Sequence, residues 1–455
     1  MENGIAARHG GRIGLAALAA ILLCGLGLRV AEAWDGRAPV YDAAAYAAIS
    51  ANLADGEGFT VGPGATQPSS NYSPGLPLLV AGIYELTGGA HERCARLVLA
   101  LIGSLAILFT YLVGRRLTLS LKHLPPRGGG NRLAVVAGLC GAAAVAIYPA
   151  LLEYQGMLMS EPLAATLLSG AVLAILWAGE RAGHWDWLLP GALLGALALV
   201  RPEYLAIALM VALLAFGRRA RADWRLGLGQ ATVLLAGLAV VLAPWAIRNA
   251  VALDRPVPIS TGGGQVLFAG TYLPSDGNPE KVGAEVVERH PDLFGPQAVE
   301  RLRLEQILAR LAASRYPDLE TDQALSRMGR EQLWDDVSEE PAEFAGFLAA
   351  KAWRLWTHGA RESTREPGWL AFHWALVALG MLGLGLLALR RRWEALLIGA
   401  IFLAITALSS LLVASPRRVL VMLPLLAACA GVGVAWLWEE LRRRRTPGTG
   451  APPPG

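Results

Sequence analysis

The sequence predicts an all-α polytopic membrane protein with about ten transmembrane helices, interfacial helices and a mixed α/β or α domain outside the membrane. Of its 455 residues, 54% are hydrophobic and only 17% are charged, whereas soluble domains have about 25% charged residues. The apolar residues gather in runs that approach the roughly 20 residues a spanning helix needs. Arginines stand mainly at the ends of these runs.

Ten apolar runs form the predicted crossings, two of them short enough to make a hairpin. They are residues 13–31, 95–114, 133–149, 162–179, 187–200, 204–216, 226–247, 369–389, 394–413 and 419–438. The first run is too long for a typical cleaved signal peptide. Basic clusters after alternate runs place both termini in the cytoplasm by the positive-inside rule. Helical spans exclude the outer membrane, so we expect a bacterial inner (plasma) membrane protein.

We expect four parts along the chain. Residues 1–250 form an N-terminal transmembrane module whose first external loop is 32–75, and residues 251–367 form an extracytoplasmic domain. Within this domain, 341–358 is typical of an amphipathic interfacial helix. Residues 368–441 form the C-terminal transmembrane helices, and 442–455 are expected to be a disordered cytoplasmic tail.

The composition also excludes other classes of protein. A net charge of +4 does not indicate nucleic-acid binding, because the arginines are not on one face or interleaved with surface aromatics. The four cysteines and seven histidines show no metal-ligand or redox spacing. A divalent metal beside the carboxylates would be compatible with the pattern, but nothing in it demands one.

The first external loop contains the most informative stretch, residues 41–77. Asp42 opens an Ala-rich helical run, and Tyr46, four residues on, shares its face. Gly56 and Gly58 end the run. A plain alternative is that Asp42 only caps a short interfacial helix.

Several arginines stand where a membrane protein seldom places them. The loop parity puts Arg417 and Arg418 outside, between two closely spaced crossings, which is uncommon for paired arginines. They could snorkel to lipid headgroups, or they could hold a phosphate, because a guanidinium matches phosphate oxygens. Arg201, at the tip of the short hairpin, and Arg248, at the end of its helix, are expected at the same depth.

Acids complete the charged set. Asp42 and Glu161 lie in the first two external loops. Charges at membrane depth cost about 2.5 to 3.5 kcal/mol each on insertion scales and therefore indicate a functional site. We expect a pocket for a lipid phosphate that faces a polar acceptor. Glu161 stands before Pro162, so a helix-capping role is its alternative.

Ordered motifs carry a resemblance to a known family. They are YDAAAY and DGEGF in the first loop, NYSPGLPLL, YPALLEYQGMLMSEPL, LVRPEYL, PWAIRNAVALDRPVPISTGGG and ASPRRVLVMLPLL. Over residues 11 to about 440 the chain resembles membrane glycosyltransferases of the GT-C fold. It is most similar in pattern to the bacterial protein mannosyltransferases and the aminoarabinose transferase of lipid A.

This resemblance implies a function and roles for site residues. Such enzymes transfer a sugar from a polyprenyl-phosphate donor at the outer membrane face and invert the anomeric centre. The first-loop acid maps onto Asp42 as general base and the second acid onto Glu161, while Arg201 and Arg417 or Arg418 map onto the donor-phosphate arginines. Substrate binding is further expected at Tyr46, Tyr72 and Arg248, although both tyrosines could be packing residues.

The partners expected are the lipid-linked donor, membrane lipids and an acceptor glycan, lipid or protein. Two departures from the family pattern leave the sugar open. Asp42 is followed by Ala, where many relatives have a DE pair, and Glu161 stands where the aminoarabinose branch tends to carry Asp. The rival functions are a lipid-linked sugar flippase or transporter, and a lipid-binding assembly factor without chemistry.

Overall fold

The computed structural model describes residues 2–445 except 63–64, 66, 122–128, 276–277, 279–280 and 296. Every regular element in these residues is a helix, and the only β feature among them is an isolated bridge between Thr60 and Pro68. The all-α prediction is therefore confirmed. Of the two expectations for residues 251–367, the helical one fits the described part of that segment.

Seven helices in the described chain are long and apolar enough to cross a membrane. They are α1 (Glu2–Trp34), α4 (Glu92–Ser120), α7 (Ser160–Glu180), α10 (Trp224–Leu253), α18 (Pro367–Leu389), α19 (Trp393–Leu411) and α20 (Arg417–Arg445). An eighth span results if α5 (Gly129–Ile147) and α6 (Pro149–Gln155), which meet at a 52° bend, are counted as one. The chain is a multi-pass membrane protein.

The expected count of ten crossings depends on a pair of shorter helices. α8 (Leu188–Val200) has 13 residues and α9 (Tyr204–Ala220) has 17, and both are below the length that usually spans a bilayer. A 3₁₀ turn, η1 (Trp185–Trp187), precedes them. Only residues 201–203 separate the two helices, as the sequence predicts, and both pack against α10. The count of ten stays a prediction.

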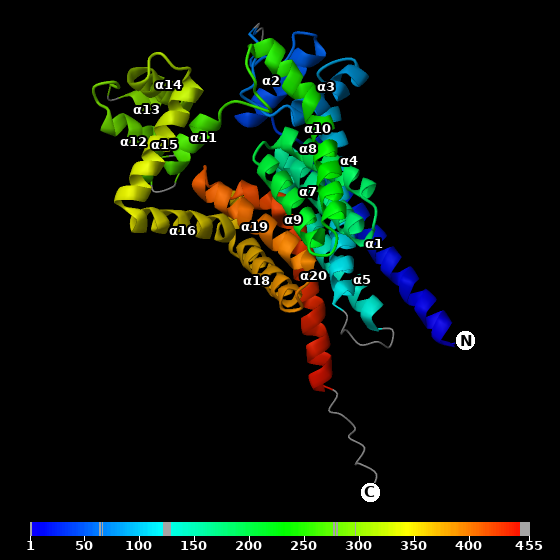
Figure 1. Ribbon diagram of the computed structural model, residues 1–455. Coiled ribbons are helices and arrows are strands. Elements are labelled where there is room, and N and C mark those ends of the chain that lie inside the picture. The colour runs from blue at the N-terminus through cyan, green and yellow to red at the C-terminus, as the bar shows by residue number, and fades with distance from the viewer. Residues whose placement is uncertain are drawn as a thin grey trace.

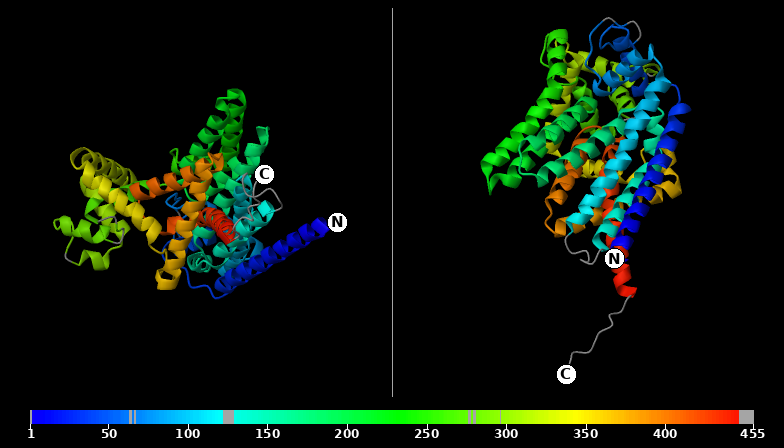
Figure 2. Two further views of the ribbon diagram at one scale, coloured as in Figure 1. Left: turned by 90° about the horizontal axis from the view of Figure 1, so that it is seen from below. Right: turned by 90° about the vertical axis from the view of Figure 1, so that its right-hand side faces the viewer.

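Two further short helices lie at one end of the bundle. These are α2 (Asp42–Ala54) and α3 (Gly75–Thr87), each 13 residues long. The N-terminal end of α1 and the C-terminal end of α20 lie toward the other end (Figure 1, Figure 2). α3 is too short to span a bilayer upright.

The bundle is centred on α7 and α20, whose most apolar windows are each 89% buried. α20 packs against α4, α5, α7 and α18. Small residues allow these close approaches. A Cβ atom on Gly383 of α18 would lie only 1.9 Å from the carbonyl oxygen of Cys429 in α20, whereas one on Gly385 would meet nothing within 4 Å.

A second group of helices has a hydrophobic core of its own beside the bundle (Figure 1). Its helices are α11 (Gly263–Thr271), α12 (Val282–Arg289), α13 (Ala298–Arg301), α14 (Leu304–Arg315) and α15 (Thr321–Glu339), with a 3₁₀ turn, η2 (Leu273–Ser275). Phe268, Val286, Leu308 and Leu325 are among the buried core residues. The expected bounds of this domain and its side of the membrane stay predictions.

One long helix, α16 (Pro341–Thr357), joins this group to the bundle and lies across the direction of the spans (Figure 1). Trp353 is exposed, whereas Trp356 donates a hydrogen bond to Thr406 of α19 at 3.0 Å. A short helix, α17 (Glu362–Arg365), follows. At the end of the chain, α20 includes residues 442–445 of the expected tail, and residues 446–455 lie outside the described part.

Candidate functional site

Asp42 is the first residue of α2 and does not cap it. The residue in the capping position is Tyr41, and no side chain caps the helix. The Asp42 carboxylate instead accepts a hydrogen bond from Nη1 of Arg417 at 3.3 Å, and its side chain keeps 44% of its surface exposed. The interaction joins the first loop to the last span, so the capping alternative does not describe this residue.

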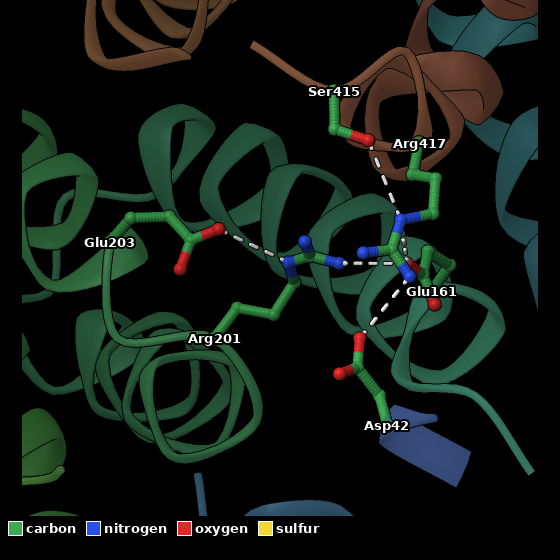
Figure 3. Close-up of polar contacts among 6 residues, drawn as sticks. All are labelled: Asp42, Glu161, Arg201, Glu203, Ser415 and Arg417. Carbon is green, nitrogen blue, oxygen red and sulfur yellow. Dashed lines mark hydrogen bonds and ion pairs between the residues drawn. The ribbon is translucent and has the colours of Figure 1, made fainter. Parts of the chain in front are cut away.

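Arg417, at the start of α20, lies between two acids (Figure 3). Besides its bond to Asp42, its Nε is 3.9 Å from Oε1 of Glu161 and donates to Ser415 Oγ at 3.4 Å. The guanidinium is partly exposed. A planar cation with several donors can bind both carboxylates and still present N–H groups to another anion.

Glu161 is the buried member of the cluster, with 2% of its side chain exposed. It lies in the first turn of α7, where the helix dipole favours an anion. Its Oε1 is 3.4 Å from Nη1 of Arg201, while its Oε2 has no hydrogen-bond partner. The contact with Arg201 is an ion pair without good hydrogen-bond geometry, because that Nη1 is also without such a partner.

Arg201 occupies the break between α8 and α9, where Pro202 prevents the helix from continuing. Its Nε donates to Glu203 Oε1 at 3.2 Å, on the side away from Glu161 (Figure 3). The charged tip of the hairpin is thus held between two carboxylates. Such pairing is what makes a buried charge tolerable.

The two tyrosines of the first loop lie next to these acids. The ring of Tyr46 meets that of Tyr72 edge-on, with centroids 5.7 Å apart. Burial, followed by the charges of Asp42 and Glu161, raises the pKa of Tyr46. Its hydroxyl therefore stays protonated and can donate a hydrogen bond at neutral pH.

Arg418 points to a different place from Arg417. It lines a small cavity with Glu203, Tyr204 and residues of α9 and α19, and its Nη1 has no hydrogen-bond partner. Among the described residues, no ion pair or hydrogen bond joins Arg418 to Asp42 or Glu161. Of the Arg201–Glu203 pair, only Glu203 lines this cavity with Arg418.

Arg248 is the predicted residue that the structure does not bring into the cluster. It donates to the carbonyl oxygens of Ser69 at 2.9 Å and Phe59 at 3.2 Å, and its guanidinium lies 4.9 Å from the ring centroid of Trp245. These contacts fasten the first loop to α10. In the part of the chain described, Arg248 contacts none of the acids of the cluster.

Sequence reasoning gave no role to Glu203 or Ser415, which also belong to the cluster. Each stands two residues from an arginine that was selected, in RPE and SPR. An acid or hydroxyl residue two positions from an arginine at a helix end could have indicated that these residues belong to the cluster.

A divalent metal beside the carboxylates stays a prediction. In the described ranges, no group of three or more His, Cys, Asp or Glu side chains could hold a metal ion. The guanidinium of Arg417, rather than a set of oxygen ligands, connects the carboxylates of Asp42 and Glu161. No step below is routed through a metal.

Comparison with known proteins reveals similarity only at the level of structure. No family model matches the sequence, and no curated protein matches it. The oligosaccharyltransferase of Archaeoglobus fulgidus, in its apo form, superposes with a TM-score of 0.55 and 18% identity over 95% of this chain and 51% of that one. The oligosaccharyltransferase AglB from the same organism, in complex with an inhibitory peptide and a dolichol-phosphate, gives a TM-score of 0.54 with the same identity and coverage.

ArnT from Cupriavidus metallidurans, bound to undecaprenyl phosphate, superposes less closely, with a TM-score of 0.42 and 14% identity over 92% of this chain and 77% of that one. The chain spans about half the length of AglB. At these identities the likeness shows the fold. The chain is a multi-pass membrane protein with the GT-C fold of AglB, as the ordered motifs indicate.

Proposed function

We propose that this protein is an inverting glycosyltransferase that moves a sugar from a polyprenyl-phosphate donor to an acceptor hydroxyl. One observation carries the proposal: an aspartate from the first loop and an arginine from the last span meet at one end of the bundle, 375 residues apart in sequence. A GT-C fold with this acid-and-arginine cluster supports such a reaction.

Asp42 is the general base. Its half-exposed carboxylate is accessible to an acceptor, whereas the carboxylate of Glu161 is closed off. As the acceptor oxygen bonds to the anomeric carbon, its proton passes to Asp42, and the bond from that carbon to the phosphate oxygen breaks. General base catalysis of this kind contributes about 10² to 10⁴ in rate.

Arg417 and Arg201 stabilise the leaving group. The electron pair of the broken bond leaves with the polyprenyl phosphate, so negative charge grows on its oxygens. Fixed cations beside those oxygens lower the energy of the transition state. Arg418, with an unpartnered nitrogen in the adjoining cavity, is a third candidate for binding this phosphate.

Glu161 has a positioning role in this scheme. It is buried and pairs with both Arg201 and Arg417, so it orients the two cations that receive the phosphate. Tyr46 and Tyr72 form the wall of the site beside Asp42. Positive-inside loops favour an active site on the extracytoplasmic face of the inner membrane. A dolichol-phosphate bound to AglB supports a lipid-phosphate donor here.

The test is donor turnover by the purified protein. A polyprenyl-phosphate sugar and a crude envelope acceptor are supplied, and the release of polyprenyl phosphate is measured. We expect wild type to turn over and Asp42→Asn to lose about 10² or more in rate. Asp55→Asn, which changes an exposed acid at the other end of α2, is the matched control and should keep wild-type activity.

Full activity of Asp42→Asn would remove the base from the mechanism. Transport of intact lipid-linked sugar across a vesicle without cleavage would instead support the flippase.

A further inference from the structure

A second charged pocket lies far from the Asp42 cluster. It has a volume of about 430 Å³ and lies where α4 and α7 end and α19 begins. Its charged lining residues are Arg115, Arg116, Glu180, Arg392 and Glu394, and Ser120 lies beside them. The reaction proposed above uses none of these residues.

The position of the pocket follows from the length of α7. Glu161 stands in the first turn of that helix and Glu180 is its last residue. At 1.5 Å per residue, the 19 steps from Glu161 to Glu180 place the two sites about 28 Å apart. The hydrocarbon core of a bilayer is about 30 Å thick. If one site lies at the headgroups of one leaflet, the pocket therefore lies at the headgroups of the other.

The arginines of the pocket are only partly neutralised. Arg116 pairs with Glu180 at 2.6 Å, and Arg392 pairs with Glu394 at 3.5 Å. Arg115 is left with one long hydrogen bond, at 3.4 Å, to Asn131. The lining therefore carries three positive and two negative charges.

Unused donors point to an anionic ligand. The Nε atoms of Arg115 and Arg392 are buried and have no hydrogen-bond partner. Arg218, stacked on Trp393 with 4.7 Å between its guanidinium carbon and the ring centroid, adds a further cation near the start of α19. Buried donors left unsatisfied are unfavourable, and oxygens of a bound anion would satisfy them.

The pocket also has an apolar side, which is partly exposed. Leu112, Leu119 and Trp177 form it. Leu119 is 48% exposed and Trp177 is 45% exposed, both on membrane-spanning helices. A ligand with a charged head and an alkyl chain would use both parts of this surface, whereas a free phosphate would use only the arginines.

We propose that this pocket binds the phosphate headgroup of an anionic membrane lipid, with Arg115 and Arg392 as the principal phosphate ligands. The proposal does not depend on the glycosyltransferase activity. It rests on the volume of the pocket, the excess positive charge, the unsatisfied guanidinium donors and the exposed apolar flank.

The experiment measures lipid binding by delipidated full-length protein in detergent. Native mass spectrometry and thermal unfolding are followed as phosphatidylglycerol, phosphatidylcholine or inorganic phosphate is added. We expect phosphatidylglycerol to bind and to raise Tm, while the other two bind at least about tenfold more weakly, because they lack the net charge or the chains. Equal binding of phosphatidylcholine or of inorganic phosphate would overturn the anionic-lipid assignment.

Paired variants locate the site. Arg115→Gln with Arg392→Gln should weaken phosphatidylglycerol binding about tenfold or more, because two charge-assisted contacts are lost. Arg221→Gln with Arg390→Gln removes the same charge from exposed positions outside the lining and should bind as wild type does. Equal effects of the two pairs would overturn the location.

Arg115→Lys with Arg392→Lys is a second test in case the glutamine pair misfolds. It keeps both charges and loses the forked geometry, so its affinity should lie between those of wild type and the glutamine variant. Wild-type affinity in this variant would overturn the role of the guanidinium groups as phosphate ligands.

Discussion

Glu161 sets the electrostatic balance of the candidate site because two arginines converge on one buried carboxylate. Breaking a buried ion pair from one side leaves uncompensated charge, which costs several kcal/mol. If Glu161 is replaced, Arg201 still pairs with Glu203 and Arg417 still pairs with Asp42. These remaining ion pairs reduce the loss of stability.

For Glu161→Gln we expect the free energy of unfolding to fall by about 3 kcal/mol. The measurement is thermal unfolding of the purified variant. Glu85→Gln makes the same chemical change at an exposed position of α3 and should have little effect. Equal stability of the two variants would show that Glu161 does not balance the charges of Arg201 and Arg417.

The site residues could be predicted only as a set of candidates. Arg417 and Arg418 were both candidates because the predicted topology places them on the external side of the membrane, where paired arginines are uncommon. Successive residues on a helix point about 100° apart, so the two arginines cannot face one partner. The expected depth in the membrane also placed Arg248 with Arg201. Depth does not specify which side of the bundle a side chain faces, and Arg248 contacts Trp245 of α10 and the first loop instead.

Among the helices, the packing of α18 on α20 depends on close backbone contact. Gly383 of α18 allows contact with the backbone of α20 at Cys429. Any side chain there must push the helices apart, and α20 is among the most buried elements of the bundle.

Gly383→Val should therefore destabilise the protein by about 3 kcal/mol, at the upper end of overpacking effects. Gly385→Val is the matched control, because it places the same side chain on the same helix with nothing within 4 Å. Thermal unfolding of both variants in one detergent is the comparison. A similar loss in both would mean that helix propensity, rather than the contact with α20, causes the effect.

The apolar runs predicted where helices occur better than where they end. The break at residues 201–203 was readable because Pro202 interrupts two apolar runs. The ends of α4 and α20 were underestimated: α4 continues to Ser120 and α20 to Arg445, beyond the apolar runs. Arg and Leu are good helix formers, so a helix can continue into polar surroundings after its apolar residues end.

Lys351 connects the two parts of the whole molecule. It lies on α16, is 1% exposed, and donates to the carbonyl oxygens of Gly270 in α11 and Leu412 after α19. Burial, and then the charges of Arg418 and Arg354, lowers the pKa of Lys351 to about 7.

This pKa predicts a pH-dependent stability. An unfolded lysine titrates near 10.4, so between about pH 7 and 10.4 the unfolded chain binds more protons than the folded one. The contribution of Lys351 to stability therefore rises with pH across this window, by at most about 1.4 kcal/mol per pH unit.

The measurement is the thermal stability of wild type and variants from pH 7 to 9. Lys351→Met should be less stable throughout, because two buried carbonyls lose their donor, and should lose this rise. Lys281→Met, at an exposed position, should keep it. An unchanged slope in Lys351→Met would assign the pH dependence to other groups.

How the helices after α10 pack together and against the bundle could be predicted least from the sequence. Residues 265–340 contain none of the motifs, and core residues such as Phe268 and Leu308 come from short helices without a long periodic pattern. The amphipathic pattern of 341–358 predicted a helix, but not that its lysine would be buried between two parts of the protein.

The bond between Asp42 and Arg417 also has a consequence for biosynthesis. The aspartate leaves the ribosome early, and its counter-ion is translated only after nearly all of the spans. A nascent chain that has inserted its earlier helices thus holds an incomplete charge cluster. Assembly of the cluster must wait for the last helix to enter the membrane, which would keep partly made chains inactive.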